Sequence, residues 1–392
     1  MVGRWLVVGE RHLLILIVTD LQIQQESKLK IVDITMDAVH VNHRGDWVFL
    51  HVLTDQGLTG IGELRAGNNY QPQMLAVREL QSELKGRDPR QIERIVSDFR
   101  SGNRNHICAL SAIEQALWDI LGKSLQVPVH VLLGGACREE IRLYANINRA
   151  TTDRTPEGFA RNAALAVEQG FDAIKLAPFD GLPSGIDSID EAQIGISCME
   201  TVRATIGPEI DLLVDCHSHF TVKGALAVAD VLRELDLFWF EQPIPETDLA
   251  ACAEVKQRCG LRVAGAEGQA WRQSFTEILG HNSMDVIMPD VKIVGGIGEL
   301  KKVADMASAW GIPTAPHGPS GPVTIAAGME VMLSHPDFLI LEYGWGEVDW
   351  RSQLTTPAEQ IYRGRLSKHD RPGLGIELNQ QVVAEHRVPL YF

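Results

Sequence analysis

The sequence has no CxxC pair and no regular cysteine spacing. This excludes a disulfide framework and predicts free, mostly buried thiols in a reducing compartment, so we expect a cytoplasmic protein. Low-complexity tracts, long Ser/Gly-rich linkers and short repeats are also missing, which excludes a repeat array. The six cysteines are Cys108, Cys137, Cys198, Cys216, Cys252 and Cys259.

Long hydrophobic runs are missing near the start of the chain as well. The run HLLILIVT, from His12 to Thr19, is far shorter than the ~20 residues that span a bilayer. A signal peptide would need a small-residue cleavage site, and the following LQIQQES does not offer one. We therefore interpret residues 1–29 as an extension of unclear role or as an overcalled start codon.

Positive charge is in deficit, with 36 Lys and Arg against 51 Asp and Glu and a net charge of -15. An acidic surface argues against binding to nucleic acids and to anionic membranes. It does not exclude a small anionic substrate, because a bound metal and a few local cations set the field inside a cleft. The 392 residues, 45% of them hydrophobic, can bury two domains or one large barrel with additions.

The first part of the chain has strand patterns followed by helix patterns. Hydrophobic and polar residues alternate from Lys30 to Val41, and a second strand pattern from Asp46 to Leu53 follows the HRG turn. Apolar spacing typical of amphipathic helices then appears at Met74–Leu84 and Ile107–Gln126. Strands followed by helices indicate a separate α+β unit, so we predict an N-terminal capping domain over residues 30–142.

After Arg142, short apolar strands alternate with helical stretches. This alternation predicts an α/β fold, a (β/α)7β TIM-like barrel over residues 143–366. We expect the C-terminal tail, residues 367–392, to pack on the capping domain. The eight predicted strands are Leu143–Ile147, Ala173–Leu176, Leu212–Asp215, Phe238–Glu241, Arg262–Ala266, Val286–Pro289, Pro313–Ala315 and Leu339–Leu341.

Acidic residues stand at the ends of three successive predicted strands: Asp215, Glu241 and Glu267. The carboxyl ends of barrel strands open on one face, so these side chains should lie close together. Three oxygen ligands with open positions suit Mg²⁺, and without a cation their charges would repel one another. An acid at such a turn is by itself an ordinary helix cap or ion-pair partner. The prediction of a magnesium site therefore depends on all three occurring in phase.

Two histidines follow other strand ends. His317 and Asp290 lie on adjacent strands, and a neighbouring carboxylate fixes the tautomer and raises the basicity of an imidazole. We interpret this pair as a general base. His217 lies two residues after Asp215 and could give a proton to a leaving hydroxyl from the opposite wall. The alternative for His217 is an ordinary surface-loop histidine.

The remaining strand ends supply weaker candidates. Lys175 could act as an acid or base or hold a substrate oxygen. A second lysine at position 177 would lower the pKa of Lys175, but that position is Ala177, and this weakens a role of Lys175 as the base. A protonated Glu342 could hydrogen-bond an enediolate oxygen. For substrate binding, the candidates are Arg44, Asn148 and Trp345, and each has the alternative of an ordinary structural or solvated side chain.

The strand-end motifs resemble those of the enolase superfamily, in its mandelate racemase-like branch, over residues 30–392. They are VD at Asp215, FEQP at Glu241, AGAE at Glu267, PD at Asp290, PHG at His317 and the final Glu342. The resemblance implies that Asp215, Glu241 and Glu267 bind Mg²⁺, and that the His317–Asp290 dyad removes the proton α to a carboxylate. It also implies that Glu342 steadies the enediolate and that the chain forms a homo-oligomer.

One departure from the racemase pattern narrows the expected reaction. The second strand ends in Lys175–Leu176–Ala177 in place of Lys-x-Lys, and the third ends in Asp215–Cys216–His217. This combination is similar to that of galactonate dehydratase-type enzymes. It implies dehydration of a sugar acid, an aldonate before an aldarate, to a 2-keto-3-deoxy acid. Racemisation, epimerisation or cycloisomerisation through the same enediolate is the alternative, and a non-catalytic sugar-acid sensor is a further one.

Overall fold

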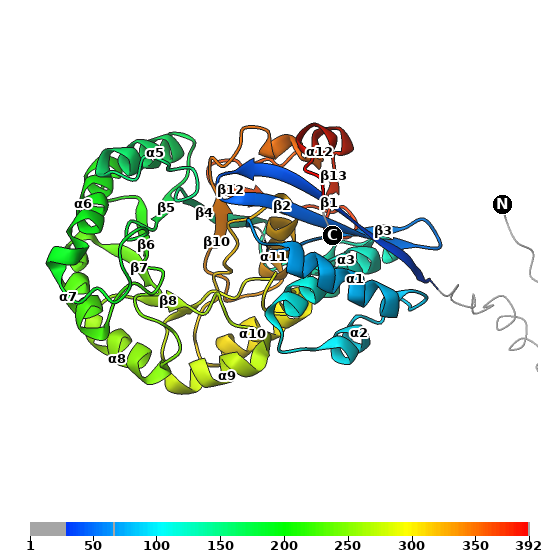
Figure 1. The fold of residues 1–392 in the computed structure, drawn as a ribbon, viewed down its shortest axis with the longest axis horizontal. Helices are drawn as coiled ribbons and strands as arrows, with labels where there is room; N and C mark the ends of the chain where they lie inside the picture. Colours follow the sequence, from blue (N-terminus) through cyan, green and yellow to red (C-terminus); the bar gives the residue numbers. More distant parts are fainter. Residues whose placement is uncertain (1–28, 66, 391–392) are drawn as a thin grey trace, which may run out of the picture.

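The computed structural model describes residues 29–65 and 67–390. The predicted N-terminal extension, residues 1–29, lies outside the described residues except for Leu29. The described part comprises an antiparallel sheet with helices and, beside it, a ring of helices around a parallel sheet (Figure 1). All six cysteines are free and all but Cys137 are buried, which confirms the prediction of free, mostly buried thiols. None of the helices in the described residues is long and apolar enough to cross a membrane.

The antiparallel sheet is a meander of β1 (Ile31–Asn42), β2 (Gly45–Thr54) and β3 (Thr59–Glu63). Its alternating residues bury one face against the long helix α3 (Arg104–Leu125). Gly60 and Gly62 permit this contact, because a Cβ at either position would meet the backbone of α3 at 2.0 or 1.9 Å. The other helices of this region are α1 (Gln71–Leu84), α2 (Ile92–Phe99) and the single turn α4 (Val129–Leu132).

The second part is a parallel sheet in the order β10-β4-β5-β6-β7-β8-β9, which confirms the α/β class. Its strands are β4 (Glu140–Asn146), β5 (Ala173–Leu176), β6 (Asp211–Asp215), β7 (Leu237–Glu241), β8 (Val263–Gly265), β9 (Val286–Ile287) and β10 (Leu341–Gly344). Outside it lie α5 (Pro156–Glu168), α6 (Ile189–Ile206), α7 (Val222–Leu232), α8 (Leu249–Cys259), α9 (Trp271–His281), α10 (Ile297–Ala309) and α11 (Pro322–Leu333) (Figure 1). A 3-10 turn, η1 (Arg233–Leu235), follows α7.

The predicted seventh strand, Pro313–Ala315, is reduced to single bridges from Thr314 to Ile287 and Phe338. Proline has no backbone N–H, so Pro313 and Pro316 limit the ladder on both sides of Thr314. These bridges nevertheless join β9 to the segment before β10. The last strand also begins later than predicted, so that Glu342 lies inside β10 and not after it.

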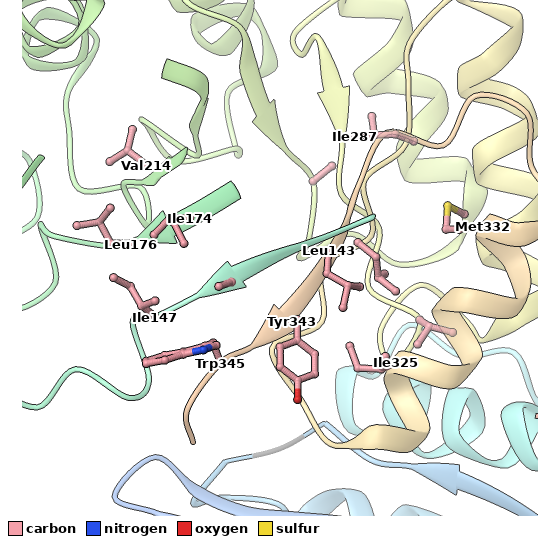
Figure 2. Packing of buried hydrophobic residues seen from close by; sticks show 14 of the residues in the cluster. Leu143, Ile147, Ile174, Leu176, Val214, Ile287, Ile325, Met332, Tyr343 and Trp345 are labelled. Atoms are coloured by element: carbon pink, nitrogen blue, oxygen red, sulfur yellow. The ribbon is translucent and has the colours of Figure 1, made fainter. Parts of the chain in front are cut away.

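The barrel has an inner and an outer apolar layer. Tyr144, Leu213 and Trp239 fill the interior with residues of the other strands. The outer layer lies between strands and helices, where Figure 2 shows Leu143 of β4 on the side of α11 that carries Ile325 and Met332. Side chains facing both directions are therefore buried, as expected for parallel strands covered by helices.

The C-terminal segment returns to the first sheet. It contains η2 (Arg351–Gln353), β11 (Thr355–Thr356), β12 (Arg365–Ser367), β13 (Glu377–Leu378) and α12 (Gln380–His386). β12 pairs antiparallel with β4. Beyond α12, the N–H of Val388 donates to the Ala38 carbonyl at 2.9 Å, and Arg387 forms a 2.8 Å ion pair with Asp37. The chain end thus binds the outer strand β1.

Two buried carboxylates attach the first part to helices of the barrel. Glu114 of α3 accepts hydrogen bonds from the N–H groups of Ile297 and Gly298, at 2.6 and 2.8 Å, where α10 begins. Glu63 of β3 accepts from Gly321 and Thr324, at 2.7 and 2.9 Å, where α11 begins. The first N–H groups of a helix have no partner within it, and its positive end favours an anion. These contacts fix the meander over the barrel opening.

Replacing Glu114 with Gln tests this attachment. We expect the free energy of unfolding to fall by about 1–3 kcal/mol, because one amide group cannot accept from both N–H groups and its NH2 faces a donor. Urea denaturation of both proteins measures the difference. The matched control is Glu93→Gln, an exposed partner of Lys302, which should change stability by less than about 1 kcal/mol. Equal losses in the two variants would contradict the attachment.

Candidate active site

A cavity of about 240 Å³ opens at the carboxyl ends of the parallel strands, under the β1–β2 hairpin. The structure brings together, on its walls, seven of the residues predicted from the sequence: Arg44, Asn148, Asp215, His217, Glu267, Asp290 and His317. The other lining residues are Arg65, Asn146, Arg149, Lys292, Pro319 and Ser320. The parallel ladder places β6 beside β7, with Asp215 opposite Glu241 at their ends.

Lys175 lies beneath the cavity among buried carboxylates. Its Nζ is 2.8 Å from Glu241, 2.8 Å from Glu342 and 3.8 Å from Asp215, and its side chain is 1% exposed. Burial lowers the pKa of Lys175, but the charges of Glu241 and Glu342 outweigh it and raise that pKa well above its usual value. Lys175 is therefore an internal counter-charge and is poorly suited to accept a proton from a substrate.

Asp215, Glu241 and Glu267 are the carboxylates that could hold a divalent cation. Burial, followed by the charge of Asp215, raises the pKa of Glu241 to about 8. No cluster of three His, Cys, Asp or Glu side chains in the described residues already has the arrangement of a metal site. Asp215 and Glu267 instead contact histidines, and the buried Oε2 of Glu267 has Nε2 of His317 at 3.1 Å without the geometry of a hydrogen bond. Hard carboxylate oxygens of this kind fit Mg²⁺.

His317 and Asp290 form the predicted dyad, although Asp290 lies three residues beyond β9. Nδ1 of His317 is 2.7 Å from Oδ2 of Asp290, and its Nε2 is 3.1 Å from Glu267. Burial lowers the pKa of His317, but the nearby charges, Glu267 first, raise it to about 9. Lys292, 2% exposed, places its Nζ 3.0 Å from the same Asp290 oxygen. His317 and Glu267 both line the cavity.

His217 lies on the opposite side of this carboxylate group. Its Nε2 is 2.9 Å from Asp215, and its Nδ1 is 2.5 Å from Oδ1 of Asp180. The charge of Asp215 is the largest cause that raises the pKa of His217 to about 11. Held between the carboxylates of Asp215 and Asp180, His217 can act as a proton donor.

The backbone at the strand ends adopts left-handed conformations at residues other than glycine. The φ angles are 43° at His217, 61° at Ser218, 41° at Gln242 and 76° at Ala266. Such conformations are uncommon for side-chain-bearing residues and concentrate where function constrains the chain. They turn the chain at the ends of β6, β7 and β8, next to the three candidate metal ligands.

Glu342 accepts hydrogen bonds on both oxygens, from Asn146 at 2.7 Å and from the Gly318 N–H at 2.8 Å. Burial raises the pKa of Glu342, but the charges of Lys175 and His317 outweigh burial and lower this pKa to about 2. This environment disfavours the predicted protonated form that donates a hydrogen bond. It favours an ionised group that fixes Lys175 and the loop after His317.

Trp345 does not line this cavity, unlike the other two substrate-binding candidates. Its indole N–H donates to Gln169 at 2.9 Å, and its ring belongs to the outer apolar layer near Ile147 (Figure 2). Asn148 and Arg44 both lie on the cavity wall, where each donates to Asp180 at 3.3 Å. The position of Trp345 after β10 placed it near the barrel opening, but its side chain turns to the helices.

The sequence interpretation missed Asp180, Lys292 and Arg65. Lys292 follows Asp290 by two residues, which is the spacing of His217 after Asp215, and this signal could have revealed it. Asp180 lies in the loop after β5, and nothing in its sequence neighbourhood distinguishes it from an ordinary loop acid. Arg65 follows β3 and reaches the cavity wall only because the meander lies over the barrel.

Two family models match the chain. "Enolase C-terminal domain-like" matches residues 158–382, and "Mandelate racemase / muconate lactonizing enzyme, N-terminal domain" matches residues 21–134. The chain belongs to the enolase superfamily, in its mandelate racemase and muconate lactonizing enzyme-like branch. With the dehydratases described next among its relatives, it is an enzyme of the carbon–oxygen lyase class.

Similar proteins include the D-xylonate dehydratase of Haloferax volcanii, 30% identical, with 92% of this chain and 89% of the relative covered. The D-galactonate dehydratase of Verminephrobacter eiseniae is 29% identical, with 86% and 90% covered. Among solved structures, a mandelate racemase/muconate lactonizing enzyme-like protein from Rubrobacter xylanophilus superposes with a TM-score of 0.86. It is 31% identical, with 93% of this chain and 98% of that chain covered.

Proposed function

We propose that this enzyme is a Mg²⁺-dependent dehydratase that converts a sugar acid, an aldonate in the first place, to a 2-keto-3-deoxy acid. The observation that carries the proposal is that His217 and His317 line one cavity together with Asp215 and Glu267. A base and an acid on the walls of one cavity suit the removal of a proton and a hydroxyl from neighbouring carbons.

The reaction follows from these positions. The neutral form of His317 takes the C2 proton at Nε2, while Asp290 holds the Nδ1 hydrogen. A cation bound at Glu267 would offset the charge that raises the pKa of His317 and so favour this neutral form. The C2–H electron pair passes to the substrate carboxylate and gives an enediolate. Its return forms the C2=C3 bond as the C3–O bond breaks, and Nε2 of His217 gives its proton to the departing oxygen. Water leaves, and the enol becomes the 2-keto acid. When bound at Asp215, Glu241 and Glu267, Mg²⁺ would neutralise the negative charge that develops on the substrate carboxylate.

The relatives support the substrate class. Those named above act on D-xylonate and D-galactonate, and a D-gluconate dehydratase from Thermoproteus tenax is 27% identical. Arg44 and Asn148 on the cavity wall are the proposed substrate contacts. We further propose a cytoplasmic homo-oligomer in which residues 30–142 are the capping domain, 143–366 the barrel and 367–392 the tail.

A substrate screen tests the function. Purified protein with Mg²⁺ is incubated with aldonic and aldaric acids, and semicarbazide detects 2-keto products. We expect activity on an aldonate that disappears with EDTA and returns when Mg²⁺ is added in excess, because the carboxylates need a cation to bind the substrate carboxylate. Activity that is unchanged by EDTA would contradict the metal requirement. The absence of 2-keto product from every acid would contradict the dehydratase.

Cycloisomerisation is the second candidate, because a D-galactarolactone cycloisomerase from Agrobacterium fabrum is 30% identical, with 87% of this chain covered. It would begin with the same base, as would racemisation or epimerisation. Reaction in D2O separates racemisation and epimerisation from dehydration, because they wash deuterium into unreacted substrate at C2. Lactone conversion without a 2-keto product would identify the cycloisomerase.

A further inference from the structure

Asp180 is a polar centre at the side of the cavity that holds His217. Its Oδ1 is 2.5 Å from Nδ1 of His217. Its Oδ2 is 3.3 Å from the side-chain nitrogens of Arg44, Asn148 and Arg154. With its side chain only 19% exposed, this carboxylate is held by four side chains, one of which comes from the β1–β2 hairpin.

The contact between Asp180 and His217 has the same geometry as the His317–Asp290 dyad on the other wall. In both pairs an aspartate oxygen meets Nδ1 of the histidine, at 2.5 Å for His217 and 2.7 Å for His317. In both pairs Nε2 points to a candidate metal ligand, Asp215 or Glu267. The cavity thus contains two His–Asp pairs that face the same carboxylate group from opposite sides.

We propose that Asp180 is the positioning residue for the acid of the reaction: by accepting the Nδ1 hydrogen of His217, it makes Nε2 the atom that gives its proton to the leaving hydroxyl. This inference rests on the proposed dehydratase function. A carboxylate on one ring nitrogen fixes both the orientation and the tautomer of a histidine. Asp215 cannot serve this purpose alone, because it is also a candidate metal ligand.

The surroundings of Asp180 support a fixed position. The backbone of His217 is itself held, since its N–H donates to Asp215 at 2.9 Å and the N–H of Ser218 donates to the Gln242 carbonyl at 2.7 Å. With the backbone held, the orientation of the imidazole ring is still free, and the contact between Nδ1 and Asp180 fixes it. Arg44 joins the hairpin to Asp180, so the meander over the barrel takes part in placing the acid.

The variant Asp180→Asn should impair the step that needs this acid. Breaking the C3–O bond sends the electron pair to oxygen, and the proton from His217 makes the leaving group water. A fluorine at C3 leaves as fluoride, a stable anion that needs no proton. Loss of the acid should therefore slow the release of water far more than the release of fluoride, whereas a general disturbance of the fold would slow both equally.

The probes are D-xylonate, D-galactonate and D-gluconate, each beside its 3-deoxy-3-fluoro analogue, with the full chain and Mg²⁺. The matched control is Asp187→Asn, in the same loop, where Asp187 instead pairs with Thr221 and Lys223. For Asp180→Asn we expect a loss of about 100-fold in kcat on the hydroxyl substrate. The loss on the fluoro analogue should be much smaller, and Asp187→Asn should resemble the wild type on both.

Equal losses on both substrates, or no loss, would overturn the inference. The ratio of the two rates comes from one preparation, so a fraction of unfolded variant does not alter it. A wild-type protein that releases neither water nor fluoride from any probe would refute the proposed function and this inference with it. Dehydration by the wild type with an unchanged rate ratio in Asp180→Asn would refute the inference alone.

Discussion

His317→Asn should lower kcat by about 100- to 10,000-fold, the usual contribution of a positioned acid or base. Asparagine can keep a hydrogen bond to Asp290, so the wall of the cavity should remain in place. It cannot accept a proton from C2 at neutral pH. The rate of 2-keto acid formation with saturating Mg²⁺ measures the loss, and substrate binding should change much less than kcat.

Exchange in D2O distinguishes this variant from one that lacks the acid. His317→Asn should neither form product nor incorporate deuterium at C2, because the first bond never breaks. His217→Asn should form little product but allow the enediolate to return to substrate with a deuteron. His281→Asn, at the exposed end of α9, is the matched control and should retain the full rate. Formation of 2-keto acid by His317→Asn at the wild-type rate, or incorporation of deuterium as fast as in His217→Asn, would assign the base to another residue.

Periodic features of the chain could be predicted from the sequence. The apolar strands that end at Asp215 and Glu241 are bounded by helical stretches. The alternation of strands and helices alone therefore predicts that both strands form and that they lie side by side in the sheet. The dyad followed for the same reason, because Asp290 and His317 belong to adjacent units of the repeat. In each case the signal is local to a few residues and recurs along the chain.

Features that depend on packing could not be predicted in this way. Thr314 has strand neighbours, but two prolines limit its ladder, and this outcome depends on how closely Ile287 and Phe338 approach. Trp345 follows a strand end as predicted, yet its ring is buried among helices because Gln169 and the apolar layer lie there. Its direction depends on tertiary contacts that no local pattern encodes.

Asp180 illustrates the limit for function. It lies in an irregular loop, and its role requires His217 and Arg44, which come from two other parts of the chain. Residue type alone is uninformative here, since a half-exposed loop aspartate, Asp187, occurs in the same segment. A side chain that acts through another side chain has no spacing rule, so only the folded structure reveals it.

Lys175→Met should cost about 3–5 kcal/mol of folding free energy in metal-free buffer, because it leaves a buried cluster of carboxylates without its cation. The Nζ of Lys175 lies 2.8 Å from both Glu241 and Glu342, and 5.2 Å from the centre of the Tyr144 ring. Water cannot replace this charge, since all these side chains are fully buried. Urea denaturation with EDTA measures the loss.

Mg²⁺ provides the decisive second measurement. A cation that binds only the native state stabilises it according to its concentration and affinity. In Lys175→Met, Glu241 has lost its nearest positive charge, so added Mg²⁺ should raise the midpoint of unfolding more than it does in the wild type. Lys223→Met, which removes an exposed partner of Asp187, should cost less than about 1 kcal/mol and show the wild-type response to Mg²⁺.

The two measurements together separate an internal counter-charge from a catalytic base. If Lys175 acted as a base, its removal would lower the rate while leaving the stability and the response to Mg²⁺ close to those of the wild type. If Lys175 balances the carboxylates, the free energy of unfolding of Lys175→Met falls in metal-free buffer, and added Mg²⁺ restores part of it. A fully stable Lys175→Met protein would mean that Glu241 and Glu342 tolerate burial without Lys175, which its short ion pairs argue against.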